Sequence, residues 1–168
     1  AFCHLGTQVV QVDIKSRLLP REDPDISEQV RRQFERDGIK VLTEHEPVKV
    51  VREDNIDYLE ALYNGETVRI EFDKIVVAIG RKPNVEGVGL EKLGVELTSS
   101  GAIQVNSAMQ TNVRNIFACG DVAGPYQYTH MASYQAFYSS INAMLSGIWK
   151  IRGNYRAVPW ATYIKPEV

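Results

Sequence analysis

The chain has 168 residues, which is enough for one ordinary domain or two small ones. Its composition, with 44% hydrophobic and 24% charged residues, is close to the average of soluble globular proteins. The net charge of −2 gives no electrostatic reason to expect binding to nucleic acid or to an anionic membrane. No apolar run approaches the ~20 residues that a membrane-spanning helix needs, so we expect no membrane partner. The two unclustered cysteines, Cys3 and Cys119, make a reducing cytoplasm the expected location.

The cysteine and histidine pattern indicates no metal-binding residues. Cys3 and Cys119 lie far apart and belong to no CxxC pair, so no disulfide framework or metal site is indicated. We expect both to be buried, unreactive thiols. His4 and His45 have no ligand or catalytic pattern around them and are expected at the surface.

The first third of the chain predicts a strand, a loop and a helix. Residues 1–5 have the character of the last turn of a helix, with Gly6 as the left-handed residue that ends it. "TQVVQVDI" (7–14) is rich in β-branched residues and predicts a strand. A loop with two prolines follows. In 25–38 apolar residues recur at every fourth position, which predicts an amphipathic helix that ends at Gly38.

The middle of the chain predicts strands. After a strand within 39–51, two strand-like runs flank the Asn-Gly pair of Asn64 and Gly65, which is the strongest short signal for a β-hairpin. The apolar run 75–79 predicts a buried strand.

The last part of the chain predicts loops, two short strands and one helix. Residues 80–101 are mostly loop, "AIQVN" (102–106) and "NIFACG" (115–120) predict short strands, and 129–145 predicts a helix. The tail from 147 is irregular and aromatic. We expect its aromatic residues to pack on another domain or on a dimer partner: Trp149, Tyr155, Trp160 and Tyr163.

Strands that alternate with helices indicate an α/β fold with a parallel sheet, to which the hairpin adds an antiparallel β-meander. A strand that ends in an acid, as Asp13 ends the first one, is typical of the second strand of a dinucleotide-binding βαβ unit. The glycine-rich fingerprint of such a unit lies about 20 residues before the acid. Counting back from Asp13 runs past Ala1, so we expect the chain to begin inside the unit.

Asp13 is the first candidate binding residue. A carboxylate at the end of this strand can accept hydrogen bonds from both hydroxyls of an adenosine ribose, and it repels the 2′-phosphate of NADP. NAD is therefore favoured over NADP, although Lys15 and Arg17 follow close by. The alternative is a surface aspartate that ends a strand in any α/β domain.

Asp121 is the second candidate binding residue, within "TNVRNIFACGDV" (111–122). The short strand before it would deliver its carboxylate to the carboxyl edge of the sheet, where ligands of α/β folds bind. Gly120 would let a ligand lie against the backbone, and Asp121 would accept a hydrogen bond from a sugar-like hydroxyl. The helix that starts near Thr129 would point its free N–H groups at an electron-rich ring.

These motifs resemble those of the class I flavoprotein pyridine nucleotide–disulfide oxidoreductases. "TNVRNIFACGDV" resembles the second FAD-binding motif of that family, and "VVAIGRKPN" (76–84) resembles the strand and crossover before it. "GLEKLGVEL" and "GAIQVN" resemble the connection between them. The resemblance covers essentially the whole chain, and it is greatest to relatives of dihydrolipoamide dehydrogenase and mercuric reductase.

The resemblance implies a flavin site. Asp121 would bind the ribityl chain of FAD, and Gly120 would allow its approach. His130, Met131 and Ala132 would lie at the start of the helix beside the pyrimidine edge of the flavin. For His130 the alternative is a structural histidine whose side chain is satisfied within the protein.

The resemblance also implies a nucleotide site and a reaction. Asp13 would bind the adenosine ribose of NAD, and Gly80 would lie near the nicotinamide nucleotide. In such enzymes a hydride passes from NAD(P)H to FAD, and the flavin then reduces a disulfide that reduces the substrate. The family's redox cysteine pair has no match in this chain, so no catalytic residue is assigned.

We therefore expect an internal fragment, truncated at both ends, of incomplete Rossmann-like FAD/NAD(P)-binding domains. Residues 1–80 would belong to the NAD(P)-binding domain, 81–147 to the FAD-binding domain, and 148–168 to a linker toward a missing dimerisation domain. The parent would be a cytoplasmic homodimer that acts on a disulfide, another small molecule or mercuric ion, and the fragment alone would be inactive. Two alternatives stay open: an NADH oxidase-like flavoenzyme without a redox disulfide, and a non-catalytic nucleotide-binding module.

Overall fold

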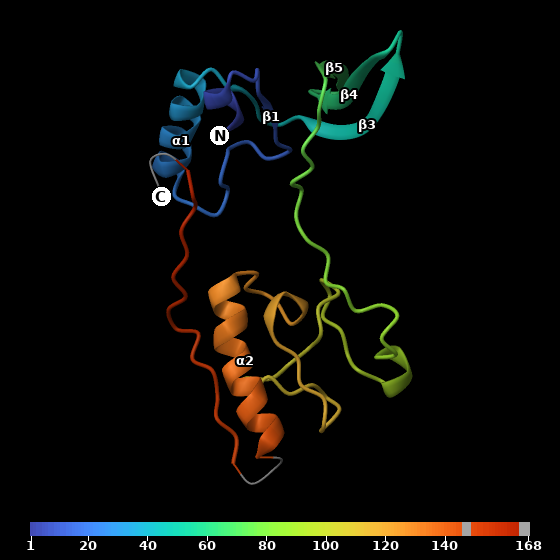
Figure 1. Ribbon diagram of the computed structural model, residues 1–168, viewed down its shortest axis with the longest axis vertical. Helices are drawn as coiled ribbons and strands as arrows, with labels where there is room; N and C mark the ends of the chain where they lie inside the picture. Colours follow the sequence, from blue (N-terminus) through green and yellow to red (C-terminus); the bar gives the residue numbers. More distant parts are fainter. Residues whose placement is uncertain (146–148, 165–168) are drawn as a thin grey trace. The chain divides into compact units, whose positions relative to one another are not determined.

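The computed structural model describes residues 1–145 and 149–164 (Figure 1). The chain divides into two compact units, Ala1–Ala78 and Ile79–Val168. The predicted boundary between residues 147 and 148 and the end of the predicted linker lie outside the described residues. Within the described parts of the chain, every helix is too short or too polar to cross a membrane.

The N-terminal unit contains the predicted parallel strand pair. It opens with the 3-10 turn η1 (Phe2–Leu5), which ends at Gly6 with φ of 88°. Strand β1 (Val10–Val12) pairs in parallel with β2 (Lys40–Leu42), and helix α1 (Pro24–Arg36) lies between them in sequence. Both strands are shorter than predicted, but the strand–helix–strand order and the parallel pairing are as expected for a βαβ unit.

Helix α1 has the predicted amphipathic character. Pro24 occupies its first turn, where the missing N–H costs nothing. Val30 is buried on the inner face, and the buried Ser27 hydroxyl donates a hydrogen bond to the carbonyl of Leu18. On the outer face, hydrogen bonds from Arg31 and Arg32 lower the pKa of Glu28 to about 2.

A three-stranded antiparallel sheet completes the N-terminal unit (Figure 1). It consists of β3 (Glu46–Glu53), β4 (Ile56–Tyr63) and β5 (Glu66–Phe72). Asn64 and Gly65 form the predicted turn, with φ of 51° and 83°. Asp54 and Asn55 form a second turn with φ of 51° and 65°, and we did not predict it. Both turns have the positive φ values that suit a two-residue hairpin.

The predicted buried strand at 75–79 is wrong. The segment forms no strand, and its large apolar side chains are exposed, with Val76 at 73% and Val77 at 68%. A β-branched run becomes a strand only when a neighbouring strand supplies hydrogen-bond partners, and none of the described segments does so here. The two predicted short strands at 102–106 and 115–120 are likewise reduced to the isolated bridges Leu97–Ile103 and Gln110–Phe117.

The C-terminal unit packs loops against one long helix. Its regular elements are η2 (Glu91–Leu93), η3 (Gly120–Val122) and α2 (Thr129–Met144), the last within one residue of the prediction. A small apolar core lies among the loops; its buried members are Val85, Val95, Ile103, Ala118 and Ala123.

Helix α2 also holds the segment that follows it. The buried Asn142 side chain accepts a hydrogen bond from the Ile151 N–H at 2.9 Å and donates to the carbonyls of Ile151 and Ala108 at 2.8 and 2.9 Å. Tyr155 stacks on Tyr126 with ring centroids 5.6 Å apart. Tyr155 therefore packs within its own unit, contrary to our expectation.

Candidate functional site

Gly120, the first residue of η3, contacts helix α2. It has φ of 76°, and its N–H donates to Oε1 of the buried Gln135 at 2.7 Å. A Cβ added at Gly120 would lie 3.3 Å from the Cβ of Ala132, which is tight for a carbon–carbon contact. We predicted that the missing side chain lets a ligand lie against the backbone, and the contact with Ala132 is a second reason for glycine at this position. Gly120 thus fixes the position of the next residue, Asp121, against α2.

Asp121 is exposed beside this junction. Its backbone carbonyl accepts a hydrogen bond from the Gly124 N–H at 3.3 Å. Its carboxylate makes no hydrogen bond or ion pair with any residue that the structure describes. Both oxygens are therefore available as acceptors, on a backbone that is held in place.

The N-terminus of α2 has no side-chain cap. Tyr128 is its N-cap residue and provides no side-chain hydrogen bond, and the first turn contains no acidic residue. The first N–H groups of a helix have no partner within the helix, so this end suits an anionic or electron-rich group.

The three residues predicted at the start of α2 have different surroundings. His130 is exposed, and its ring stacks on that of Tyr128, with centroids 5.4 Å apart and an angle of 9° between the ring planes. Met131 is buried, and Ala132 contacts Gly120. Of the three side chains, only that of His130 is well exposed to solvent.

Asp13 lies directly after β1 in the N-terminal unit. Its backbone N–H donates to the Leu42 carbonyl at 2.9 Å, and its Oδ1 accepts from the Lys15 N–H at 2.8 Å. One carboxylate oxygen is therefore used in a local turn, which leaves Oδ2 for a ligand. The Arg17 guanidinium donates to the Pro20 carbonyl at 3.0 Å.

Gly80 is exposed, with φ of 119° and open space around the position of a Cβ. The structure brings no predicted site residue against it within its own unit. Its backbone conformation suits glycine, but its surroundings do not define a site.

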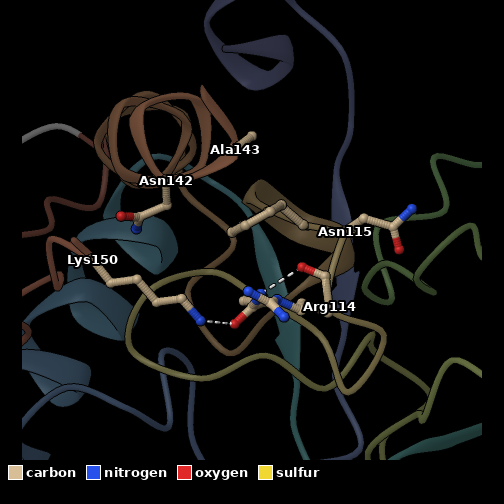
Figure 2. Close-up of a pocket in the computed structure, with 7 residues that line it drawn as sticks. Arg114, Asn115, Asn142, Ala143 and Lys150 are labelled. Carbon is tan, nitrogen blue, oxygen red and sulfur yellow. Dashed lines mark hydrogen bonds between the residues drawn. The ribbon is translucent and has the colours of Figure 1, made fainter. Parts of the chain in front are cut away.

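A separate pocket of about 460 Å³ opens in the C-terminal unit (Figure 2). Gln110 organises it, because it accepts a hydrogen bond from Nζ of Lys150 and donates to the Arg114 carbonyl at 2.5 Å. None of the predicted site residues lines it. Its lining residues are Gln110, Arg114, Asn115, Phe117, Asn142, Ala143 and Lys150.

Two expectations about cysteine and histidine are wrong. Cys3 and Cys119 are half-buried rather than buried. His45 is buried; its Nδ1 donates to the Thr43 carbonyl at 2.6 Å, and its ring stacks on Tyr63 with centroids 4.3 Å apart. His4 is exposed as predicted, but it is paired with Asp37, which the sequence pattern did not indicate because the two residues belong to different elements.

Comparison with known proteins decides the family. The family model described as pyridine nucleotide-disulphide oxidoreductase matches residues 1–136. The chain belongs to the pyridine nucleotide-disulphide oxidoreductase family. This confirms the resemblance seen in the sequence, and membership of the family implies the use of FAD and NAD(P).

Relatives in this oxidoreductase family match nearly the whole chain. Dihydrolipoyl dehydrogenase from Mycobacterium leprae is 36% identical over 164 residues, which is 97% of this chain and 35% of the relative. The protein of the same name from Bacillus subtilis is 36% identical over 168 residues, which is 99% of this chain and 35% of the relative. The chain thus spans about a third of the length of these relatives.

Solved structures of the same family have the same fold. The HOCl-induced flavoprotein disulfide reductase RclA from Escherichia coli superposes with a TM-score of 0.83 at 25% identity, over 99% of this chain and 37% of that one. LpdA from Mycobacterium tuberculosis also reaches 0.83, at 26% identity, over 99% of this chain and 35% of that one. The predicted fold class, α/β with parallel and antiparallel sheets of this family, is confirmed.

Proposed function

We propose that this chain is an internal part of an FAD-dependent disulfide oxidoreductase that takes its hydride from NAD(P)H. The observation that carries the proposal is the unpartnered Asp121 carboxylate on a backbone held against α2, whose N-terminus is open. The similarity of nearly the whole chain to dihydrolipoyl dehydrogenases supports it.

The residues present fit the flavin. A carboxylate with free oxygens suits the hydroxyls of a ribityl chain, and the first-turn N–H groups of α2 suit the electron-rich pyrimidine edge. Gly120, held by Gln135 and Ala132, sets the position of Asp121. His130 lies at the same helix end, where its side chain can donate or accept a hydrogen bond. When bound, FAD supplies the two-electron chemistry that links a nicotinamide to a disulfide.

We assign nucleotide preference to Asp13. Its free Oδ2 can accept a hydrogen bond from a ribose hydroxyl, while its negative charge repels a 2′-phosphate. One guanidinium nitrogen of Arg17 donates to a carbonyl within its own loop, which directs that side chain toward Pro20. These features favour NAD over NADP. Gly80 keeps its proposed place near the nicotinamide nucleotide on the strength of the family resemblance alone.

The remaining features of the parent enzyme are proposed from the same resemblance. We propose a cytoplasmic homodimer whose substrate is a disulfide or dithiol, with dihydrolipoamide favoured over mercuric ion. Trp149 and Tyr163 are exposed, which supports the proposal that another protein domain or a partner subunit packs on the C-terminal tail. No pair of redox cysteines is present in the sequence, so the chain alone should not reduce a disulfide.

The first test is the intact mass of the native protein that carries this sequence. A mass clearly above 18.9 kDa, bound FAD and NADH-dependent reduction of lipoamide would support the proposal. NADH-dependent disulfide reduction by the isolated 168-residue chain would contradict the proposal that this chain alone cannot reduce a disulfide.

The second test addresses Asp121 in that native protein. Asp121→Ala removes a charged acceptor, so the affinity for FAD should fall by about 10- to 100-fold, as expected for a lost charge-assisted hydrogen bond. Glu91→Ala is the matched control, because Glu91 is an exposed acid on η2 in the same unit. If the two variants contain equal amounts of flavin, Asp121 does not bind FAD.

A further inference from the structure

Three metal-ligand side chains meet where η1 and α1 end. The Sγ of Cys3, the Nε2 of His4 and a carboxylate oxygen of Asp37 all lie within 4.8 Å of one another. Cys3 and His4 belong to η1, and Asp37 is the C-cap residue of α1. A thiol, an imidazole and a carboxylate thus converge from two separate elements.

The spacing of His4 and Asp37 already suits one metal ion. Their Nε2 and Oδ2 atoms are 3.3 Å apart. Zinc–nitrogen and zinc–oxygen bonds of about 2.0 Å at the tetrahedral angle place two ligand atoms about 3.3 Å apart. A zinc ion bound by both side chains would therefore need little change in their separation.

The Asp37 carboxylate is oriented before any metal arrives. Its Oδ1 accepts a hydrogen bond from Nε2 of Gln33 at 2.9 Å, so Oδ2 is the oxygen directed at His4. Its backbone N–H is held by the Gln33 carbonyl at 3.0 Å. Hydrogen bonds of this kind to a ligand side chain orient it and raise metal affinity. The C-terminal end of α1, with its partial negative charge, further favours a cation here.

The place of the cluster separates it from the proposed cofactor residues. Cys3 and His4 precede β1, and Asp37 precedes the parallel strand β2, so the cluster lies toward the amino ends of the two strands. Asp13 follows β1 at its carboxyl end. Metal binding at this cluster would therefore not require the nucleotide site.

We propose that Cys3, His4 and Asp37 form a zinc-binding site. The mixture of sulfur, nitrogen and oxygen ligands suits Zn²⁺ and disfavours Mg²⁺ and Ca²⁺, which take oxygen ligands. As zinc binds, the Cys3 thiol loses its proton to solvent, and the contact between His4 Nε2 and Asp37 Oδ2 is replaced by a bond from each atom to the metal. The neutral imidazole then carries its proton on Nδ1, and a water molecule takes the fourth position. The role is to tie η1 to α1, independently of the proposed flavin chemistry.

Titration of the 168-residue chain with Co²⁺ in a reducing, chelator-free buffer tests the site. We expect one Co²⁺ per chain, a thiolate-to-cobalt charge-transfer band, and displacement of Co²⁺ by Zn²⁺. Cys3→Ser should abolish the band, and Gln33→Ala should weaken binding by about 10-fold through the lost orienting hydrogen bond. Cys119→Ser is the matched control and should keep the band.

The proposal is overturned if the folded chain binds no Co²⁺, or if the band survives Cys3→Ser or disappears in Cys119→Ser. Circular dichroism checks that each variant folds. If Cys3→Ser does not fold, His4→Gln decides, because the His4 side chain is 56% exposed and not required for packing. Loss of at least 10-fold in affinity in His4→Gln supports the site, and unchanged affinity rejects it.

Discussion

Gly120 shows how a glycine beside a candidate binding residue also stabilises the local fold. Its positive φ disfavours most side chains, and a Cβ at this position would lie only 3.3 Å from the Cβ of Ala132. The hydrogen bond to Gln135 satisfies its N–H in a buried position. Together these contacts dock η3 on α2 and position Asp121.

Gly120→Ala should destabilise the C-terminal unit by about 2–3 kcal/mol, because left-handed strain and overpacking against Ala132 add. Gly94→Ala is the matched control: Gly94 also has a positive φ, of 69°, but has open space around its Cβ position. It should cost only about 1–2 kcal/mol. Urea unfolding of both variants measures the difference, and equal losses would show that the Ala132 contact is unimportant.

Asp13 illustrates the limit of sequence reasoning at the residue scale. The pattern of a strand followed by an acid predicted its position at the end of β1, which the structure confirms. The hydrogen bond from the Lys15 N–H to Oδ1 closes an Asx turn, which aspartate favours by residue type, but the strand pattern alone did not predict it.

At the scale of elements, the three-stranded sheet is tied by ion pairs across its strands. Lys49 on β3, Glu60 on β4 and Arg69 on β5 are direct neighbours in the strand register. The Glu60 oxygens lie 3.2 Å from Nζ of Lys49 and 2.8 Å from the Arg69 guanidinium. Hydrogen bonds first from Lys49 and then from Arg69 outweigh desolvation and lower the pKa of Glu60 below its ordinary value of 4.5.

This arrangement predicts acid sensitivity. A carboxyl whose pKa is lower in the folded state stabilises the fold above its unfolded pKa, and that contribution is lost as the pH falls through the folded value. The sheet should therefore lose stability as the pH falls below about 4.5, the ordinary value for Glu60. Thermal unfolding between pH 7 and low pH measures this loss.

Glu60→Gln should lower stability near neutral pH and reduce the loss at acid pH, since it removes the titrating group. Glu71→Gln, at an exposed acid on β5 without an ion pair among the described residues, is the control and should leave the pH dependence unchanged. If the two variants show the same pH profile as the original chain, the ion pairs across the sheet do not stabilise it.

Elements with local signals were predicted, and elements that depend on distant partners were not. The Asn64-Gly65 turn and α2 follow from turn chemistry and helical periodicity. The run 75–79 has the composition of a strand but no partner strand among the described residues. Strand pairing is a long-range property, so composition alone could not decide it.

At the scale of the whole molecule, both units expose more apolar surface than a stable monomer usually does. The run 75–79 contains four exposed large apolar residues, and Phe137 on α2 is 59% exposed. Contiguous apolar surface of this kind marks a place where further protein packs, or a tendency to aggregate. The proposal that this chain is part of a longer enzyme accounts for it.

The double substitution Val76→Thr with Val77→Thr should reduce binding of a hydrophobic dye and self-association, without lowering the unfolding temperature. The reason is that both side chains are already in water. Val85→Thr, in the buried core of the C-terminal unit, is the control and should cost about 1–3 kcal/mol through its buried hydroxyl. Unchanged dye binding in the double variant would show that the apolar surface that binds the dye does not include Val76 and Val77.

By itself the sequence determined the family, the α/β class, helices α1 and α2 and the position of Asp13 directly after β1, because these depend on local periodicity and on motifs that are contiguous in the chain. Only the tertiary structure decided that Ala132 fills the space beside Gly120, that His45 is buried on Tyr63, and that Cys3, His4 and Asp37 meet. The physical reason is that each of these contacts joins residues from separate elements, whose approach is set by packing rather than by sequence spacing.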